Sequence, residues 1–266
     1  MKRRFDKMHG LGNDFVIVDA RTEPFDVTPS LARAIADRRT GIGCDQLIVL
    51  EASDSADLKM RIWNSDGGEV ESCGNATRCV VQLTGARRIE TDGGLLDGES
   101  FGAEVEVSIR EPRFRWDEIP LAYPMDSAAL PLTWGELQHP IALNVGNPHL
   151  VFFVPDAREV PLDDLGPRIE NDPAFPERIN VNVATYVDKR LKLRTFERGA
   201  GETLACGTGA CASAVAAIVT KRAEPPVTVD MTGGSLTVSW APGEPIRMRG
   251  SATHVFSGEV DLDTLR

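Results

Sequence analysis

Apolar residues occur in short runs between glycine-bearing turns, and one of these runs is unlike the others. Residues 210–219 are almost entirely small and apolar, so they are predicted to form a helix without a polar face, buried in a core. A second such helix is predicted over 75–83. Each helix follows a Cys-Gly pair, at Cys73 and at Cys206.

Other apolar runs, several of them alternating with polar residues, predict strands. A surface helix is predicted over 29–39, a turn-rich start over 8–14 and a proline-rich helical connection that ends near 177. The predicted strands are 15–19, 47–51, 58–63, 94–96 and 103–110 in the first half, and 141–145, 150–154, 181–187, 190–196, 226–230, 235–240 and 245–249 in the second.

The two Cys-Gly pairs belong to an internal repeat. Both copies read Gly-Glu, three residues, Cys-Gly, and Cys206 follows Cys73 by 133 positions. Gly12-Asn13 corresponds in the same way to Gly146-Asn147, with an offset of 134 positions. A duplicated chain folds most simply as two similar lobes. We expect a pseudo-twofold axis between them, with the two cysteines facing each other across a cleft.

The repeat and the strand pattern together predict an α+β fold, in which each lobe is a mostly antiparallel sheet curved around one apolar helix. Prolines at 112, 120 and 124 interrupt the pattern between the copies. The predicted lobes are therefore 1–117 and 118–254, and the alternating tail 255–266 is expected to return to the first.

Composition excludes several classes of function. The chain has 29 basic and 40 acidic residues, a net charge of −11, whereas nucleic acids and anionic membranes require basic surfaces. It has no apolar run near the length of a membrane span, and no hydrophobic leader follows its first residues. We expect a soluble cytoplasmic protein that binds neither nucleic acid nor membrane.

The chain has five cysteines, an odd number that disfavours a disulfide framework. Zinc is disfavoured as well, because no Cys-x-x-Cys occurs and the four histidines are scattered. Cys79 and Cys211 lie inside the apolar helices and are interpreted as small buried hydrophobic residues. Cys44 is also interpreted as structural. This leaves Cys73 and Cys206 as the candidates for chemistry.

A helix N-terminus carries unpaired N–H groups and a partial positive charge, which favour a thiolate and a bound anion. Two thiols of this kind suggest a two-base reaction. One removes a proton from a carbon and the other returns a proton to the opposite face, which inverts the stereocentre. The helix-end amides would hold the adjacent carboxylate.

Two alternatives remain open from the residues alone. A hydrolase or transferase with one nucleophilic cysteine would need an adjacent base, for which His149 is the only histidine in a suitable turn. A binding protein would use the helix ends only to hold an anion. The first alternative leaves the second Cys-Gly copy without a role.

Five motifs span nearly the whole chain: Met8–Phe15, Asn64-Ser65-Asp66-Gly67, Cys73–Arg78, Gly146–His149 and Glu197–Ala210. They closely resemble, in the same order, the motifs of the diaminopimelate epimerase family. The resemblance implies a cofactor-independent enzyme that interconverts LL- and meso-2,6-diaminopimelate in lysine and peptidoglycan precursor synthesis. It also implies a two-cysteine mechanism, a homodimer and no metal.

The resemblance also assigns residues. Cys73 and Cys206 match the acid/base pair, and His149 and Glu197 match groups thought to tune the thiols. Gly68 departs from the family pattern, which more often has serine there. The matched substrate contacts are Asn13, Gln46, Asn64, Gly74, Asn75, Asn147, Asn180, Glu197, Arg198, Gly207 and Thr208.

Overall fold

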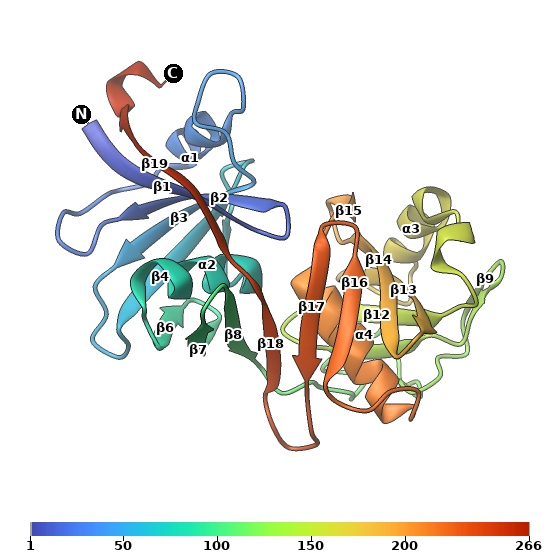
Figure 1. Cartoon of the computed structure of the whole chain (residues 1–266). Coiled ribbons are helices and arrows are strands. Elements are labelled where there is room, and N and C mark those ends of the chain that lie inside the picture. The colour runs from blue at the N-terminus through green and yellow to red at the C-terminus, as the bar shows by residue number, and fades with distance from the viewer. Residues whose placement is uncertain (1, 266) are drawn as a thin grey trace. The chain divides into compact units, whose positions relative to one another are not determined.

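The computed structural model describes residues 2–265, which form two compact units (Figure 1). The first unit contains the residues up to Ser108 and those from Arg249 onward, and the second unit is Ile109–Met248. This division falls before the expected boundary at 117 and 118. Two backbone hydrogen bonds of 2.8 and 2.9 Å join Arg113 to Asn144, which ties the linker to the second unit.

The first unit is built on one mostly antiparallel sheet. Its strands are ordered β19, β1, β2, β3, β4, β6, β7 and β8, with parallel pairing only between β2 and β3 and between β4 and β6, while β5 is added antiparallel to β4. The bounds are β1 (Lys2–Gly10), β2 (Asn13–Asp19), β3 (Gln46–Glu51), β4 (Leu58–Asn64), β5 (Glu69–Val70), β6 (Arg88–Thr91), β7 (Gly94–Phe101), β8 (Glu104–Ile109) and β19 (Thr253–Asp261).

In the second unit, β11 to β17 repeat the pairings of β1 to β7. β11 pairs antiparallel with β12, β12 parallel with β13, and β13 antiparallel with β14; β14 then pairs antiparallel with β15 and parallel with β16, which pairs antiparallel with β17. The bounds are β11 (Ile141–Asn144), β12 (Pro148–Phe153), β13 (Asn180–Val187), β14 (Arg190–Glu197), β15 (Gly201–Thr203), β16 (Val227–Met231) and β17 (Gly234–Ser239), with a short hairpin of β9 (Thr133–Trp134) and β10 (Leu137–Gln138). Strand β18 (Ile246–Ser251) includes the last residues of the second unit and continues into the first.

Each sheet is covered by helices, which explains why its inner strands are apolar on successive residues rather than alternating. In the first unit α1 (Pro29–Ala36) packs on β3 and β4, while α2 (Gly74–Thr84) packs on β1, β2 and β7. In the second unit α3 (Leu162–Glu170) packs on β13 and β14, and α4 (Gly207–Val219) lies against β11 to β14, β16 and β17.

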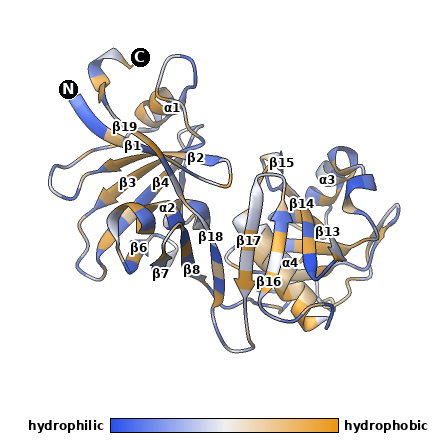
Figure 2. Cartoon of the chain, in the orientation of Figure 1, coloured by the Kyte–Doolittle hydropathy of each residue, from blue (hydrophilic) through white to orange (hydrophobic). Residues whose placement is uncertain are grey.

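The predicted core helix is present as α4. Every residue from Gly209 to Ala217 is buried, and Figure 2 shows hydrophobic colours along the helix. Alanine-rich sequence has a high helix propensity, and burial on all sides requires the absence of a polar face. Its counterpart α2 ends at Gly85, whose φ of 71° is in the left-handed region that glycine adopts at little cost.

The α+β class is confirmed, with two local corrections. The helix predicted over 29–39 ends at Ala36, because the Asp37 carboxylate accepts hydrogen bonds from the backbone N–H groups of Arg39 and Thr40. The stretch 8–14, expected to be turn-rich, has its turn only at Leu11 and Gly12, between β2 and the nine-residue strand β1 that ends at Gly10. The main partner of β1 is β19, at the other end of the sequence, and no pattern within residues 2–10 themselves indicated a strand there.

Candidate active site

In the second unit the cysteine lies between a hairpin and the buried helix. Strands β14 and β15 pair through Glu197 and Gly201, and the chain then reaches Cys206, the N-cap of α4. The Cys206 Sγ accepts a hydrogen bond from the Gly209 N–H at 3.3 Å. Only 4 % of Cys206 is exposed. The sulfur therefore sits on the amide end of a helix and is almost covered.

A chain of polar groups leads away from this sulfur. The Thr208 Oγ1 lies 3.5 Å from the Cys206 Sγ and accepts a hydrogen bond from the Asn147 Nδ2 at 3.4 Å. The Asn147 Oδ1 lies 2.9 Å from the Nε2 of His149. His149 is completely buried on β12, next to Asn180 of β13. The helix start and two strands thus converge on one thiol.

His149 is held in its neutral form. Burial, followed by the charge of Arg198, lowers the pKa of His149 to about 3. Its Nδ1 lies 3.0 Å from the Nδ2 of Asn182, and its Nε2 contacts Asn147. Both ring nitrogens are engaged away from the sulfur, so the imidazole is not the adjacent base that a single-cysteine nucleophile would need.

The expected low thiol pKa is wrong for Cys206. Burial, and next the charge of Glu197, raise the pKa of the Cys206 thiol well above its ordinary value, although Thr208 and the Gly209 N–H act in the opposite direction. The sequence showed the helix start but not the depth at which it lies. Cys206 is thus a thiol in this state, with two hydrogen-bond donors in place to stabilise a thiolate.

Glu197 is the last residue of β14, and Arg198 follows it. Glu197 accepts a hydrogen bond from the Thr203 hydroxyl, while the Arg198 Nη1 donates to the carbonyl of Glu177 at 2.9 Å. Arg198 is exposed. Asn180 is buried and anchors the backbone here, because its Oδ1 accepts from the Arg198 N–H at 2.9 Å and its Nδ2 donates to the Pro148 carbonyl at 2.8 Å.

The first unit places Cys73 at the equivalent point, as the N-cap of α2. The Cys73 Sγ lies 3.9 Å from the Oδ1 of Asn13, to which Asn75 also donates through its Nδ2 at 3.2 Å. Cys73 is partly exposed, whereas Cys206 is buried. Gly74, like Gly207 in the second unit, is the first residue of its helix.

Asn13 is held from the side opposite the thiol. Its Nδ2 donates to the Asp45 carboxylate at 3.0 Å, and the same oxygen accepts the Asp14 N–H at 3.0 Å. Burial raises the pKa of Asp14, but hydrogen bonds from Arg38 and Lys7 outweigh it, so the pKa falls well below its ordinary value. These fixed charges orient the amide of Asn13 with its oxygen toward Cys73.

Gln46 and Asn64 form a second amide pair in the first unit. The Gln46 Nε2 donates to the Asn64 Oδ1 at 2.8 Å across the paired strands β3 and β4. The Gln46 Oε1 is buried and has no hydrogen-bond partner among the described residues. Such an acceptor is costly unless a ligand supplies a donor.

The predicted residues therefore fall into two half-sites, one in each unit. Sequence reasoning missed the residues that orient them: Asp45 in the first unit, and Asn182 and Thr195 in the second. Asn182 and Thr195 looked like ordinary members of alternating strands. The signal was available in the repeat, because strand register aligns them with Ile48 and Ile62 of the first copy.

The other cysteines are buried and are not activated. Burial raises the pKa of Cys44 to about 11 and that of Cys79 to about 12. Cys211 is completely buried within α4.

The described residues contain no group of three or more His, Cys, Asp or Glu side chains that could hold a metal ion. Within residues 2–265, no helix is long and apolar enough to cross a membrane.

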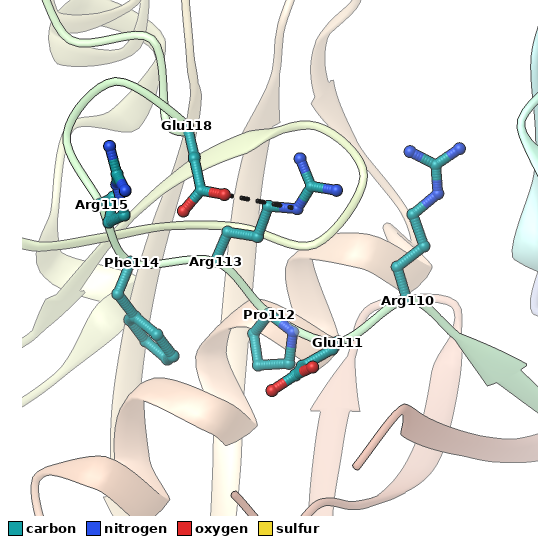
Figure 3. A pocket seen from close by; sticks show the side chains of 7 residues that line it. All are labelled: Arg110, Glu111, Pro112, Arg113, Phe114, Arg115 and Glu118. Atoms are coloured by element: carbon teal, nitrogen blue, oxygen red, sulfur yellow. Dashed lines mark ion pairs between the residues drawn. The ribbon is translucent and has the colours of Figure 1, made fainter. Parts of the chain in front are cut away.

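An open hollow lies on the linker of the second unit, away from the cysteine (Figure 3). Its lining comes from one segment, Arg110–Arg115 with Glu118, and the one ion pair drawn there joins Arg113 to Glu118 at 4.0 Å. None of the residues predicted to be functional lines it, so it adds nothing to the two half-sites.

Comparison with known proteins agrees with the motifs. The model of the family described as diaminopimelate epimerase matches residues 5–111 and 141–255. The diaminopimelate epimerase of Rhizorhabdus wittichii is 62 % identical over 265 residues, covering 98 % of this chain and 97 % of that protein. The diaminopimelate epimerase of Sphingopyxis alaskensis is 62 % identical over 263 residues, covering 98 % of each.

Solved structures with low identity share the fold. A phenazine biosynthesis protein of the PhzF family from Enterococcus faecalis has a TM-score of 0.71 at 12 % identity, covering 98 % of this chain and 100 % of that chain. A hydroxyproline epimerase from Agrobacterium vitis has a TM-score of 0.65 at 14 % identity, covering 97 % and 91 %. At these identities the likeness shows the fold alone.

Proposed function

The chain belongs to the diaminopimelate epimerase family, and we propose that it interconverts LL- and meso-2,6-diaminopimelate with Cys73 and Cys206 as the acid/base pair. The observation that carries this proposal is the repeated half-site. Each unit presents a cysteine as the N-cap of a buried helix, with the amide of an asparagine, Asn13 or Asn147, beside the helix start.

The proton balance of the reaction needs both thiols. The thiolate of one cysteine takes the proton from the α-carbon and becomes a thiol, and the thiol of the other gives its proton to the opposite face and becomes a thiolate. The product therefore carries the inverted configuration, and the enzyme is left poised for the reverse direction. The helix-end N–H groups, at Gly74 and Asn75 and at Gly207 and Thr208, would stabilise the negative charge that develops on the substrate carboxylate.

The remaining matched residues supply the rest of the proposed site. Arginine binds carboxylates through a fixed fork and glutamate binds ammonium groups, so Arg198 and Glu197 suit an amino-acid end of a diamino dicarboxylate. The unpartnered Gln46 Oε1, next to Asn64, would accept from a substrate ammonium. Asn180 supports this region through the Arg198 backbone. We propose a reaction without a cofactor, since the two thiols and the helix ends provide its acid, base and anion sites.

The homodimer implied by the family resemblance and the cytoplasmic location expected from composition stay predictions. The rival with a single nucleophilic cysteine is disfavoured by His149, which is neutral and bonds to two asparagines. A pure binding protein would not need a thiol at each helix start.

Isotope transfer tests the proposal directly. LL-Diaminopimelate incubated with the protein in D2O, with a chelator and no added cofactor, should give early product that carries deuterium at the inverted carbon, while unreacted substrate keeps its proton. Each face has its own thiol, and the returning proton comes from the second thiol, which has exchanged with solvent. Product that retains mainly the original proton would contradict the two-cysteine assignment, and no conversion at all would contradict the proposed substrate.

A further inference from the structure

Three polar side chains are buried beneath the start of α4, where the first unit has only apolar ones. His149 and Asn182 are 0 % exposed and Thr195 is 2 % exposed. Strand register aligns them with Phe15, Ile48 and Ile62 of the first unit, in that order. Burial of polar groups is costly, and the first unit shows that this fold forms without them at these positions.

The backbone fixes the orientation of Asn182. Its Nδ2 donates to the carbonyl of Leu150 at 2.8 Å, and its Oδ1 accepts from the Thr195 hydroxyl at 3.0 Å. A backbone carbonyl can only accept, so a reversed amide would set two oxygens against each other. Asn182 therefore presents an N–H to its next neighbour.

That neighbour is the Nδ1 of His149, at 3.0 Å from the Asn182 Nδ2. Because Nδ1 must accept, the proton of the neutral ring is on Nε2, which donates to the Asn147 Oδ1 at 2.9 Å. The other end of that amide, Nδ2, then donates to the Thr208 Oγ1 at 3.4 Å. The Thr208 hydroxyl keeps its own proton for the Cys206 Sγ, 3.5 Å away.

We propose that Asn182 is a positioning residue of the candidate active site: its amide selects the Nε2-protonated tautomer of His149 and thereby aims the NH2 of Asn147 at Thr208, beside Cys206. The proposal rests on the proposed function only in taking Cys206 as a reactive thiol. This chain of hydrogen bonds, from Asn182 through His149 and Asn147 to Thr208, is called the relay below. Its donor-to-acceptor direction is fixed at one end by the Leu150 carbonyl, a backbone group of the sheet that can only accept.

The contact between the sheet and α4 fits this role. A Cβ placed on Gly209 would lie 2.6 Å from the Asn182 Oδ1 and 2.8 Å from the Thr195 Oγ1. Glycine inside a helix is less stable than alanine, and the first unit has Ala76 at the equivalent position. Gly209 allows the helix start to lie directly on the polar pair.

The test is Asn182→Asp, which keeps the shape but replaces the donor with an acceptor. With ring-15N histidine labelling, NMR of the parent protein should show the Nε2-protonated neutral form of His149. In the variant the proton should move to Nδ1, or the ring should become an imidazolium. A parent spectrum with the proton on Nδ1, or an unchanged tautomer in the folded variant, would overturn the proposal.

Two further variants keep the test decisive. Asn171→Asp makes the same chemical change at an exposed amide that donates to the Pro167 carbonyl at 2.7 Å, and it should leave the His149 spectrum unchanged. Asn182→Leu offers neither donor nor acceptor, so if the aspartate variant does not fold, His149 in the leucine variant should show a mixture of tautomers. A single Nε2-protonated form in that variant would refute selection by Asn182.

Kinetics separate this inference from the proposed function. With diaminopimelate, Asn182→Asp should lower kcat by about 10- to 100-fold with little change in KM, because the relay acts on the thiol and not on substrate binding. A parent protein without epimerase activity would contradict the proposed function, while the spectrum would still decide the tautomer. A lower kcat with an unchanged tautomer would contradict the positioning role and leave the proposed function intact.

Discussion

The two units have the same strand pairings and both carry a cysteine at the start of a buried helix, but they orient the neighbouring asparagine in opposite ways. In the first unit a carboxylate, Asp45, takes the NH2 of Asn13, so the oxygen of the amide points to Cys73. In the second unit His149 donates to the oxygen of Asn147, so its NH2 points to Thr208. The repeated fold sets the positions of the two asparagines, and a few neighbouring residues decide whether the oxygen or the NH2 of each amide faces the helix start.

This difference has a chemical meaning for the proposed reaction. A thiol beside an acceptor oxygen donates its proton to that oxygen, whereas a sulfur beside donors is stabilised as a thiolate. Cys73 lies beside the acceptor oxygen of Asn13, and Cys206 beside the donors Thr208 and Gly209, although burial and then Glu197 keep the pKa of Cys206 high in the described state. The two halves of a duplicated site are therefore not interchangeable.

The largest expected effect is the loss of either thiol. Cys73→Ala and Cys206→Ala should each lower kcat for epimerisation by about 1000-fold or more, because each removes one of two proton-transfer groups. Steady-state assays in both directions would measure this. Cys211→Ala, a change of the same kind at a buried position in α4, is the control. If one of the two cysteine variants keeps substantial activity, the units do not share the chemistry.

The next effect concerns the apolar counterpart of Asn182. Ile48→Asn places an amide between Ile17 and Ile62, its partners on the neighbouring strands, and should lower the free energy of unfolding by about 3 kcal/mol. Urea denaturation would measure the change. Ile48→Val, which removes one methylene group, should cost about 1 kcal/mol. A cost below that of the valine control would mean that the first unit also tolerates polar residues beneath its helix.

Stability should also depend on pH through His149. Its pKa in the folded chain is lowered to about 3, so below the ordinary value of 6.5 the unfolded chain binds a proton that the folded chain does not. Stability is therefore lost as the pH falls, by about 2 kcal/mol between pH 7 and pH 5 from this residue. Denaturant titrations should show a correspondingly smaller loss in His149→Gln.

The control for that measurement is His139→Gln, the same replacement at an exposed position of the second unit. It should leave the difference in stability between pH 7 and pH 5 as in the parent. If the free energy of unfolding fell equally with pH in the parent and in His149→Gln, His149 would be protonated in the folded chain. A protonated ring has no single neutral tautomer, so that result would also contradict the relay.

What could be predicted from the sequence follows from what is local or repeated. Composition predicted the buried helices and the apolar strands, because both are runs of apolar residues. The 133-residue offset identified the cysteines at the helix starts as a repeated pair. Strand β1 was missed because its partner β19 is formed by the other end of the chain. The pKa of Cys206 was mistaken because the charge of a helix end can be inferred from sequence, whereas the depth of burial cannot.

The orienting residues were missed for a different reason. Asn182 lies in a stretch of β13 where polar and apolar residues alternate, and Thr195 follows charged residues of β14; polar residues in such strands usually face solvent. Only the register of β13 with β14 places them opposite each other, and only the packing of α4 buries them. Alignment of the two copies would have singled out Asn182 and Thr195, because the equivalent residues of the first copy are both isoleucine.

The smallest effect is expected from the residue that orients Asn13. Asp45→Asn can offer an oxygen or an NH2 to Asn13, so the side chain at 45 no longer fixes that amide. Only the Asn75 Nδ2, which donates to the Asn13 Oδ1, then still favours the original orientation, and the amide presents its NH2 to Cys73 for part of the time. We expect kcat to fall by about 10-fold, a smaller effect than in the cysteine variants because both thiols remain.

Asp92→Asn is the matched control for Asp45→Asn. It removes one carboxylate charge from the same unit, at a residue that forms an ion pair with Lys59 at 3.1 Å and lies outside the half-site. Steady-state kinetics on both variants would separate the orientation of Asn13 from the general effect of charge. An equal loss of kcat in the two variants would mean that Asp45 acts only through its negative charge, as part of the electrostatic field of the unit. A loss confined to Asp45→Asn would mean that each unit needs its own device to orient the asparagine beside its cysteine.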